Sequence, residues 1–579
     1  MPMARSDPPY SGRAYPRDSI WEDIRRPGLT PAALEIDRLT AELPKRWAVY
    51  RYKLSRSLLW VLFIGGTGTG KSTLFNVLCG EPLSEAGVER PKTCGPLVYA
   101  HRQVPLEQDF PFLRMDIGRF PPEDASSSPH AGEPGRLFVL EHRREDLVHA
   151  AIVDTPDLDS LEMRNRSMVE DLYLLADLVV FVTSQEKYAD DVPFQFLLRI
   201  RQEEKPCFFI FNKAEAMLDR EEVRAALRGQ GITIPEDRLW VLPFLPSQPS
   251  ELLPAQKSFK SFSRSFFQLS AQGGASRLLQ SERQRSAREL ASKTGRLIDL
   301  LEKENEAAGK WLDHLDFFFK TARGSLFEQQ EEHLSGEARR YLEQEIRRLY
   351  GKYDLLGKPR RFIARIFLRP LGLLGLNAGQ PRESPREALA RLRRKIDLIP
   401  VQAAVEGFNR SVLEKLSPAD QTSVLYKKLR EPHLALTGDE IRKHVMEEQE
   451  RLGKWLENTF QDLAKGIPKS KEWGIYSTSI LWGGLILSLE VLIGGGFHIL
   501  EAVLDSAIAP FVTRGAVELF AYQEIRKIGH ELGERYKNGL ASVIEEQRSR
   551  YAECLRSVMI SPEAIAALKA TQHLLPDDL

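Results

Sequence analysis

The chain has 579 residues, more than a single hydrophobic core usually organises, which predicts two or more domains. Hydrophobic residues make up 42% of it and charged residues 28%, a composition that argues against a polytopic membrane protein and against extensive disorder. Basic and acidic side chains both number 81, so no net charge attracts nucleic acid or an acidic surface over long distances.

The N-terminal part of the sequence indicates a tail followed by a helix. Residues 1–29 contain acidic side chains and lack an apolar run, so they match neither a transit peptide nor a signal peptide, and we interpret them as a flexible tail. Thr30 followed by Pro31 is typical of a helix start. We therefore expect a neck helix over residues 30–56, interrupted or kinked at Pro44.

Residues 57–250 contain short apolar runs, each followed by polar or helical sequence. The runs are LLWVLFIGG, AAIVDTP, DLVVFVT, PCFFIFNKAE and RLWVLPF. This alternation is typical of strands and helices that build a mostly parallel sheet, so we predict an α/β domain over this range. A stretch rich in Pro, Ser and Gly, residues 121–135, is predicted to be a surface loop.

The first apolar run leads into GGTGTGKST, which begins at Gly65 and matches G-x-x-x-x-G-K-[ST]. Its glycines allow consecutive backbone amides to point at phosphate groups. Lys71 would reach the β- and γ-phosphates and Ser72 would ligate Mg²⁺. The helix that begins near Thr73 adds the positive end of its dipole. The sequence therefore predicts the phosphate-binding loop of a P-loop nucleoside-triphosphatase.

Three further motifs follow in the order that a GTPase requires. The segment RPKT carries Thr93, which could close over Mg²⁺ and the γ-phosphate as part of a mobile switch. Asp154 in VDTPD ends an apolar strand, where it could hold the Mg²⁺ shell through water. The motif NKAE places Asn212, Lys213 and Glu215 directly after a strand, where a guanine base would lie. Together these motifs favour GTP over ATP.

The second half of the chain has a different pattern. Residues 251–472 and 517–579 are long, charged segments of helical period with few Gly or Pro. We predict an elongated all-α helical-bundle stalk, in which the C-terminal helices return to pack against the others.

Two segments of this half suggest a membrane contact. Residues 358–376 place four basic side chains on one side of a helix and apolar ones on the other, as in a helix that lies on an anionic membrane. Residues 473–516 form an apolar stretch, too interrupted for a full span, that we interpret as a hairpin dipping into one leaflet. Burial of either segment in a protein core is the alternative.

The segment RPKT, the loop GGTGTGKST with LFNVLCG after it, and ADLVVFVTSQEKYAD after DTPD resemble the dynamin superfamily, especially bacterial dynamin-like GTPases. The resemblance covers residues 57–250 and, over the helical half, rests on architecture. Three positions differ from the family pattern. Thr67 replaces a water-positioning glutamine, Asp157 replaces the glycine that ends the second switch, and Glu215 replaces the aspartate that reads guanine.

The motifs and this resemblance together define the expected site. We expect Mg²⁺ to be held by Ser72, Thr93 and Asp154, and hydrolysis to depend on Lys71 and Thr93. The nucleotide would contact Gly66, Thr67, Gly68, Thr69, Gly70, Lys71, Ser72, Thr73, Asp157, Asn212, Lys213 and Glu215. The nearest candidate for an arginine finger is Arg90, for which a structural role is equally compatible with the sequence.

The predicted function is a dynamin-like GTPase that hydrolyses GTP with Mg²⁺ and couples hydrolysis to membrane binding or remodelling through its stalk. The resemblance implies a homodimer formed through the GTPase domains. Four scattered cysteines favour the cytoplasm, so we expect peripheral association with the inner face of an anionic lipid membrane. Two alternatives stay open: a switch GTPase that binds a ribosome, RNA or protein, and a GTP-binding scaffold with little hydrolysis. Nucleic acid is the less favoured partner.

Overall fold

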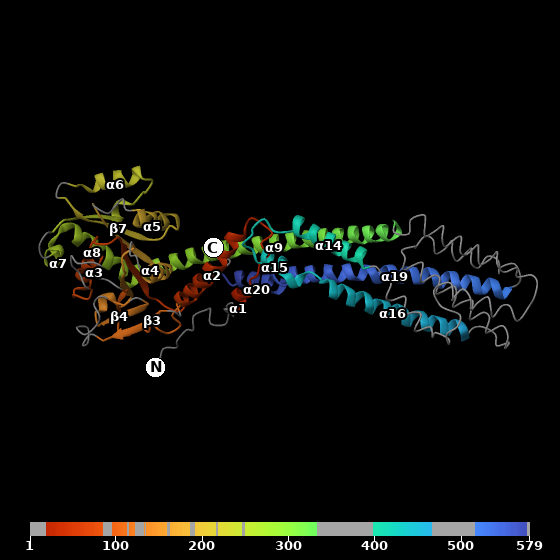
Figure 1. The fold of residues 1–579 in the computed structure, drawn as a ribbon. Helices are drawn as coiled ribbons and strands as arrows, with labels where there is room; N and C mark the ends of the chain where they lie inside the picture. The colour runs from red at the N-terminus through yellow and green to blue at the C-terminus, as the bar shows by residue number, and fades with distance from the viewer. Residues whose placement is uncertain are drawn as a thin grey trace, which may run out of the picture. The chain divides into compact units, whose positions relative to one another are not determined.

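The computed structural model describes residues 19–84, 95–112, 115–121, 132–133, 135–158, 163–185, 191–215, 218–245, 249–332, 398–465 and 516–575 (Figure 1). They belong to two compact units. The described residues of the first unit lie within Met1–Ile24, Leu34–Leu300 and Ser561–Leu579. Those of the second unit lie within Arg25–Ala33 and Leu301–Ile560.

The centre of the first unit is an eight-stranded sheet with the order β3, β4, β2, β5, β1, β6, β7, β8. Neighbouring strands pair in parallel except β2 and β5, which pair antiparallel. The strands are β1 (Leu59–Gly65), β2 (Leu97–His101), β3 (Asp116–Phe120), β4 (Arg136–His142), β5 (Ala150–Asp154), β6 (Leu178–Ser184), β7 (Cys207–Ala214) and β8 (Leu239–Pro243).

Helices cover both faces of this sheet. Along β1, Trp60, Leu62 and Ile64 belong to one apolar core, while the alternate residues belong to another, because successive side chains of a strand point to opposite faces. The first core also contains residues of α2, α4, α5 and α6, and the second contains residues of α3 and α8. Burial on both faces explains why the central strands are almost continuously apolar.

The described helices of the first unit have the following bounds. They are α1 (Ser19–Glu22), α2 (Ala33–Leu54), α3 (Lys71–Cys79), α4 (Met163–Leu175), α5 (Asp191–Gln202), α6 (Arg220–Gly229), α7 (Pro249–Leu252), α8 (Lys257–Ser270) and α20 (Pro562–Gln572), with short 3-10 turns at Glu145–Leu147, Glu236–Arg238 and Leu253–Ala255. Helix α9 (Gln272–Glu332) contributes its residues up to Leu300.

The predicted α/β class with a mostly parallel sheet is confirmed, and the five apolar runs correspond to β1, β5, β6, β7 and β8. Strands β2, β3 and β4 were not predicted. Strand β3 lies at the sheet edge and stays partly exposed, so its sequence DIGRF needs no apolar run. Most of the loop predicted over residues 121–135 lies outside the described residues.

Helix α2 continues through Pro44, so the predicted interruption is wrong, whereas the alternative of a kink stays a prediction. A proline inside a helix removes one backbone hydrogen bond. The neighbouring side chains of Leu43 and Trp47 are buried, and this apolar burial offsets the loss.

The second unit is helical, as predicted. Its core contains Trp311, whose indole Nε1 donates to the carbonyl oxygen of Leu416 at 2.8 Å. The buried Gln547 side chain donates to Leu434 O at 2.9 Å and accepts from Leu436 N at 2.7 Å. These backbone groups lie between α15 and α16 and thereby obtain hydrogen-bond partners. The described elements of the second unit are α9 from Leu301 onward, α14 (Ile399–Lys415), α15 (Val424–Leu429), a 3-10 turn (Pro432–Leu434), α16 (Gly438–Lys465) and α19 (Ala516–Arg556).

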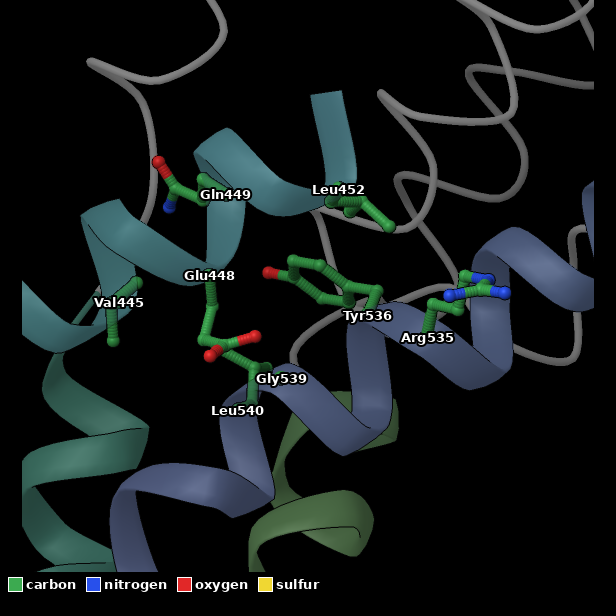
Figure 2. A pocket seen from close by; sticks show the side chains of 8 residues that line it. All are labelled: Val445, Glu448, Gln449, Leu452, Arg535, Tyr536, Gly539 and Leu540. Carbon is green, nitrogen blue, oxygen red and sulfur yellow. The ribbon is translucent and has the colours of Figure 1, made fainter. Parts of the chain in front are cut away.

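A small pocket opens between α16 and α19 (Figure 2). Gly539 lies beside Glu448, because a Cβ at Gly539 would be in ordinary van der Waals contact with Glu448 Cβ, at 3.5 Å. The lining offers neither a glycine-rich loop nor a cluster of metal ligands, so we place the functional site elsewhere. The lining residues are Val445, Glu448, Gln449, Leu452, Arg535, Tyr536, Gly539 and Leu540.

The basic segment 358–376 and the apolar hairpin 473–516, apart from residue 516, lie outside the described residues. Among the helices that the structure describes, none combines the length and the apolar character needed to span a membrane.

Candidate nucleotide-binding site

Strand β1 leads directly into the predicted phosphate-binding loop. All of β1 is buried, and α3 begins at Lys71, immediately after the loop. Gly68 and Gly70 have φ angles of 73° and 96°, a left-handed conformation that residues with side chains rarely adopt. A Cβ on Gly70 would also lie 2.3 Å from Asn212 Nδ2. Glycine is therefore required where the loop turns and passes close to β7.

The Lys71 side chain bends back over this loop. Its Nζ donates to the carbonyl oxygens of Gly65 and Gly66, each at 3.1 Å, and to Asp157 Oδ1 at 2.5 Å. Lys71 is only 4% exposed, so its charge is almost completely removed from water and depends on these partners. Asp157 therefore points its carboxylate toward the lysine that the sequence assigns to phosphate binding.

Asp154 lies at the end of β5, paired in register with Phe63 of β1. Its Oδ2 accepts hydrogen bonds from Ser72 Oγ and Ser84 Oγ, both at 2.7 Å. Burial raises the pKa of Asp154, whereas the two hydroxyl donors and the charge of Lys71 act in the opposite direction. The other carboxylate oxygen, Oδ1, is buried and has no hydrogen-bond partner.

These oxygen atoms fit the predicted magnesium ion. Mg²⁺ prefers oxygen ligands and keeps several of its waters. The Ser72 hydroxyl could ligate it directly, and the buried Oδ1 of Asp154 could accept a hydrogen bond from one of its waters. Over the described residues, no group of three or more His, Cys, Asp or Glu side chains could hold a metal, so phosphate and water would have to complete this coordination.

Two residues of the site, Asn76 and Ser84, were not predicted from the sequence. Asn76 Oδ1 accepts from the backbone amides of Leu83 and Ser84 at 3.1 and 2.8 Å, and its Nδ2 donates to Ser84 O at 2.7 Å. Asn76 thereby fixes the segment that brings Ser84 to Asp154. The available signal was an asparagine among the apolar residues of LFNVLCG, since a buried amide needs nearby partners.

The predicted guanine motif ends β7, beside the phosphate loop. Asn212 Nδ2 donates to Thr69 O, and Lys213 Nζ donates to Gly68 O, both at 2.8 Å. The side chain of Glu215 is exposed, and its backbone amide donates to Gln185 Oε1 at 3.4 Å. The structure therefore brings Asn212 and Lys213 onto the loop and leaves the Glu215 carboxylate accessible.

The other predicted site residues are distributed as follows. Gly66 and Thr69 are buried, and Thr69 Oγ1 donates to Gly66 O at 3.0 Å. Thr67 and Thr73 are partly buried, in the loop and in the first turn of α3. Thr93 and the candidate finger Arg90 lie outside the described residues.

Residues 60–213 match the model of the family described as 50S ribosome-binding GTPase. This range contains the phosphate loop, Asp154 and the first two residues of NKAE. The first unit contains a P-loop GTPase domain.

Two curated proteins are similar to part of this chain. An uncharacterized protein in the xynA 3′ region of Caldicellulosiruptor sp. is 25% identical over 176 residues, which cover 28% of this chain and 42% of that protein. The probable transmembrane GTPase FZO-like, chloroplastic, of Arabidopsis thaliana is 26% identical over 168 residues, which cover 29% of this chain and 16% of that protein. The chain thus spans less than half the length of these relatives.

Two solved chains of an oligomerised bacterial dynamin pair, described as a mechanism for long-range sensing and tethering of membranes, match 96% of this chain and 83% and 82% of their own length. Their identity is 15% and their TM-scores are 0.28 and 0.26, so nothing about the arrangement of this chain follows from them. The predicted resemblance to dynamin-like GTPases is confirmed by the family model and the FZO-like relative.

Proposed function

We propose that the chain binds GTP together with Mg²⁺ and hydrolyses it. The observation that carries the proposal is the meeting of Lys71, the Ser72–Asp154 pair and the NKAE residues around one glycine-rich loop. Backbone amides from Gly66 to Thr73 would bind the phosphates, and Lys71 would neutralise charge on the β- and γ-phosphates. Ser72, Asp154 and Thr93 would hold Mg²⁺, which supplies further charge neutralisation when bound. Thr93 would also help position the attacking water.

Guanine recognition is assigned to Asn212, Lys213 and Glu215. We expect Glu215→Ala to remove the preference for GTP over ITP, which lacks the exocyclic amino group that this carboxylate would accept from. A charged hydrogen bond contributes about 1.5–3 kcal/mol, so the wild type should bind GTP about tenfold or more tightly than ITP. Competition binding with a fluorescent nucleotide measures both affinities.

Glu221→Ala is the matched control for this experiment. Glu221 lies on α6 and forms a surface ion pair with Arg224, at 2.7 Å, so its removal should leave base preference unchanged. A Glu215→Ala variant that still prefers GTP as strongly as the wild type would refute the assigned role.

We further propose that the GTPase acts at the surface of an anionic membrane, in the cytoplasm, as a homodimer paired through its GTPase domains. Support comes from the sequence of residues 358–376 and 473–516 and from the resemblance to dynamin-like GTPases. Four basic side chains near acidic lipids would contribute about 1 kcal/mol each.

Flotation of the full chain with phosphatidylserine-containing vesicles tests the membrane proposal. We expect the protein to rise with these vesicles, and to rise less with neutral phosphatidylcholine vesicles or when the basic residues of 358–376 are changed to glutamate. Protein that stays at the bottom with anionic vesicles, with and without GTP, contradicts it. Co-sedimentation with 50S ribosomal subunits instead would support the ribosome-associated alternative, which the description of the matched family favours.

A further inference from the structure

All three hydrogens of the Lys71 ammonium have hydrogen-bond partners. An ammonium group donates three hydrogen bonds. Lys71 directs them to Gly65 O, Gly66 O and Asp157 Oδ1. A phosphate oxygen that binds this lysine must therefore displace one of these acceptors.

The two carbonyl acceptors belong to the backbone, and each accepts a further hydrogen bond. Gly65 O also accepts from the backbone amide of Leu158 at 3.2 Å, and Gly66 O also accepts from Thr69 Oγ1 at 3.0 Å. Asp157 contributes a side chain instead, which is 20% exposed and can turn toward water. The Asp157 carboxylate is therefore the partner that an entering phosphate displaces.

We propose that Asp157 is a specificity-determining residue that lowers the affinity for nucleoside triphosphates relative to diphosphates. Its carboxylate is an internal counterion for Lys71, in the place where the sequence assigns the terminal phosphate. This inference rests on the proposed function, because it concerns the same site.

The physical cause is repulsion between like charges, which grows with the number of charges and falls with distance. A triphosphate brings its terminal phosphate to Lys71, next to the displaced carboxylate, and so experiences the largest repulsion. A diphosphate would also place its β-phosphate at Lys71, but it carries less charge and lacks the γ-phosphate beside the carboxylate. The repulsion from Asp157 is therefore larger for a triphosphate than for a diphosphate.

Asp157→Asn removes the charge and keeps the shape of the side chain. We expect about a tenfold or larger gain in affinity for a non-hydrolysable GTP analogue with Mg²⁺, and a smaller gain for GDP with Mg²⁺, both measured by calorimetry on the full chain. Asp157→Gly should change the ratio of the two affinities in the same direction, whereas Asp157→Glu should keep it near the wild-type value. The melting temperature without nucleotide should fall in the neutral variants, because buried Lys71 loses its counterion.

Asp171→Asn is the matched control, since it removes the same charge from an ion pair with Lys45, at 2.6 Å, on the surface of the same unit. An unchanged or lower ratio of triphosphate to diphosphate affinity in both neutral variants overturns the inference. It is also overturned if Asp157→Gly raises the ratio and Asp157→Asn does not, because backbone freedom would then be the cause. If the wild type and every variant bind neither nucleotide, the proposed function itself fails.

Discussion

Changing Lys71 to alanine is expected to lower the rate of GTP hydrolysis by about 10²–10³-fold, the usual cost of removing one preorganised charge-stabilising donor. The expectation follows from its position, because Lys71 begins α3 directly after the loop and its buried ammonium lies against the loop carbonyls of Gly65 and Gly66. Phosphate release with saturating GTP and Mg²⁺ measures the effect. GTP affinity should fall as well, because the lysine binds the nucleotide before and during the reaction.

The fold of the GTPase domain should survive this change. Lys71 forms its ion pair with Asp157, a side chain that is partly exposed and can become solvated when the lysine is absent. Far-UV circular dichroism checks the fold, and Lys45→Ala, which removes a surface lysine paired with Asp171, should keep wild-type activity. Equal phosphate release by wild type and Lys71→Ala would instead support the GTP-binding scaffold with little hydrolysis.

Changing Phe262 to alanine is expected to lower the free energy of unfolding of the first unit by about 3–5 kcal/mol. Phe262 of α8 is fully buried, and its ring centroid lies 5.5 Å from that of Trp240 in β8 and 6.3 Å from that of Phe208 in β7. Removal of the ring leaves a cavity between the helix and the sheet. Urea unfolding followed by circular dichroism measures the change.

Phe244→Ala provides the comparison, since this phenylalanine is 57% exposed and directly follows β8. Its removal should change the free energy of unfolding by less than about 0.5 kcal/mol. Similar losses in both variants would show that α8 does not pack on the sheet as the structure places it.

The sequence was most informative where one local pattern determined the structure. The phosphate loop could be predicted because its glycines, lysine and serine are contiguous and follow a buried strand. The helical second half could be predicted from its period over long segments. Strands β2 and β4 were missed because their apolar runs are short and end in histidine, and their pairing with distant segments leaves no local signal.

Contacts between distant residues could not be predicted from the sequence. The carboxylate of Asp157 could have pointed away from the site, and only the fold places it on Lys71, 86 positions earlier in the chain. The same holds for Ser84, which reaches Asp154 because the Asn76 amide bends the intervening segment. Such contacts depend on tertiary packing of β5 against β1 and α3, which composition and periodicity do not encode.

We assign the loop from Gly65 to Ser72 to binding of the triphosphate tail of a guanine nucleotide. Titration calorimetry of the full chain with a non-hydrolysable GTP analogue and Mg²⁺ tests it most directly, with the matching ATP analogue and the Lys71→Ala variant as comparisons. We predict saturable binding of the GTP analogue, weaker binding of the ATP analogue, and a lower affinity for both in the variant. Absence of heat from either nucleotide with folded wild-type protein would contradict the claim.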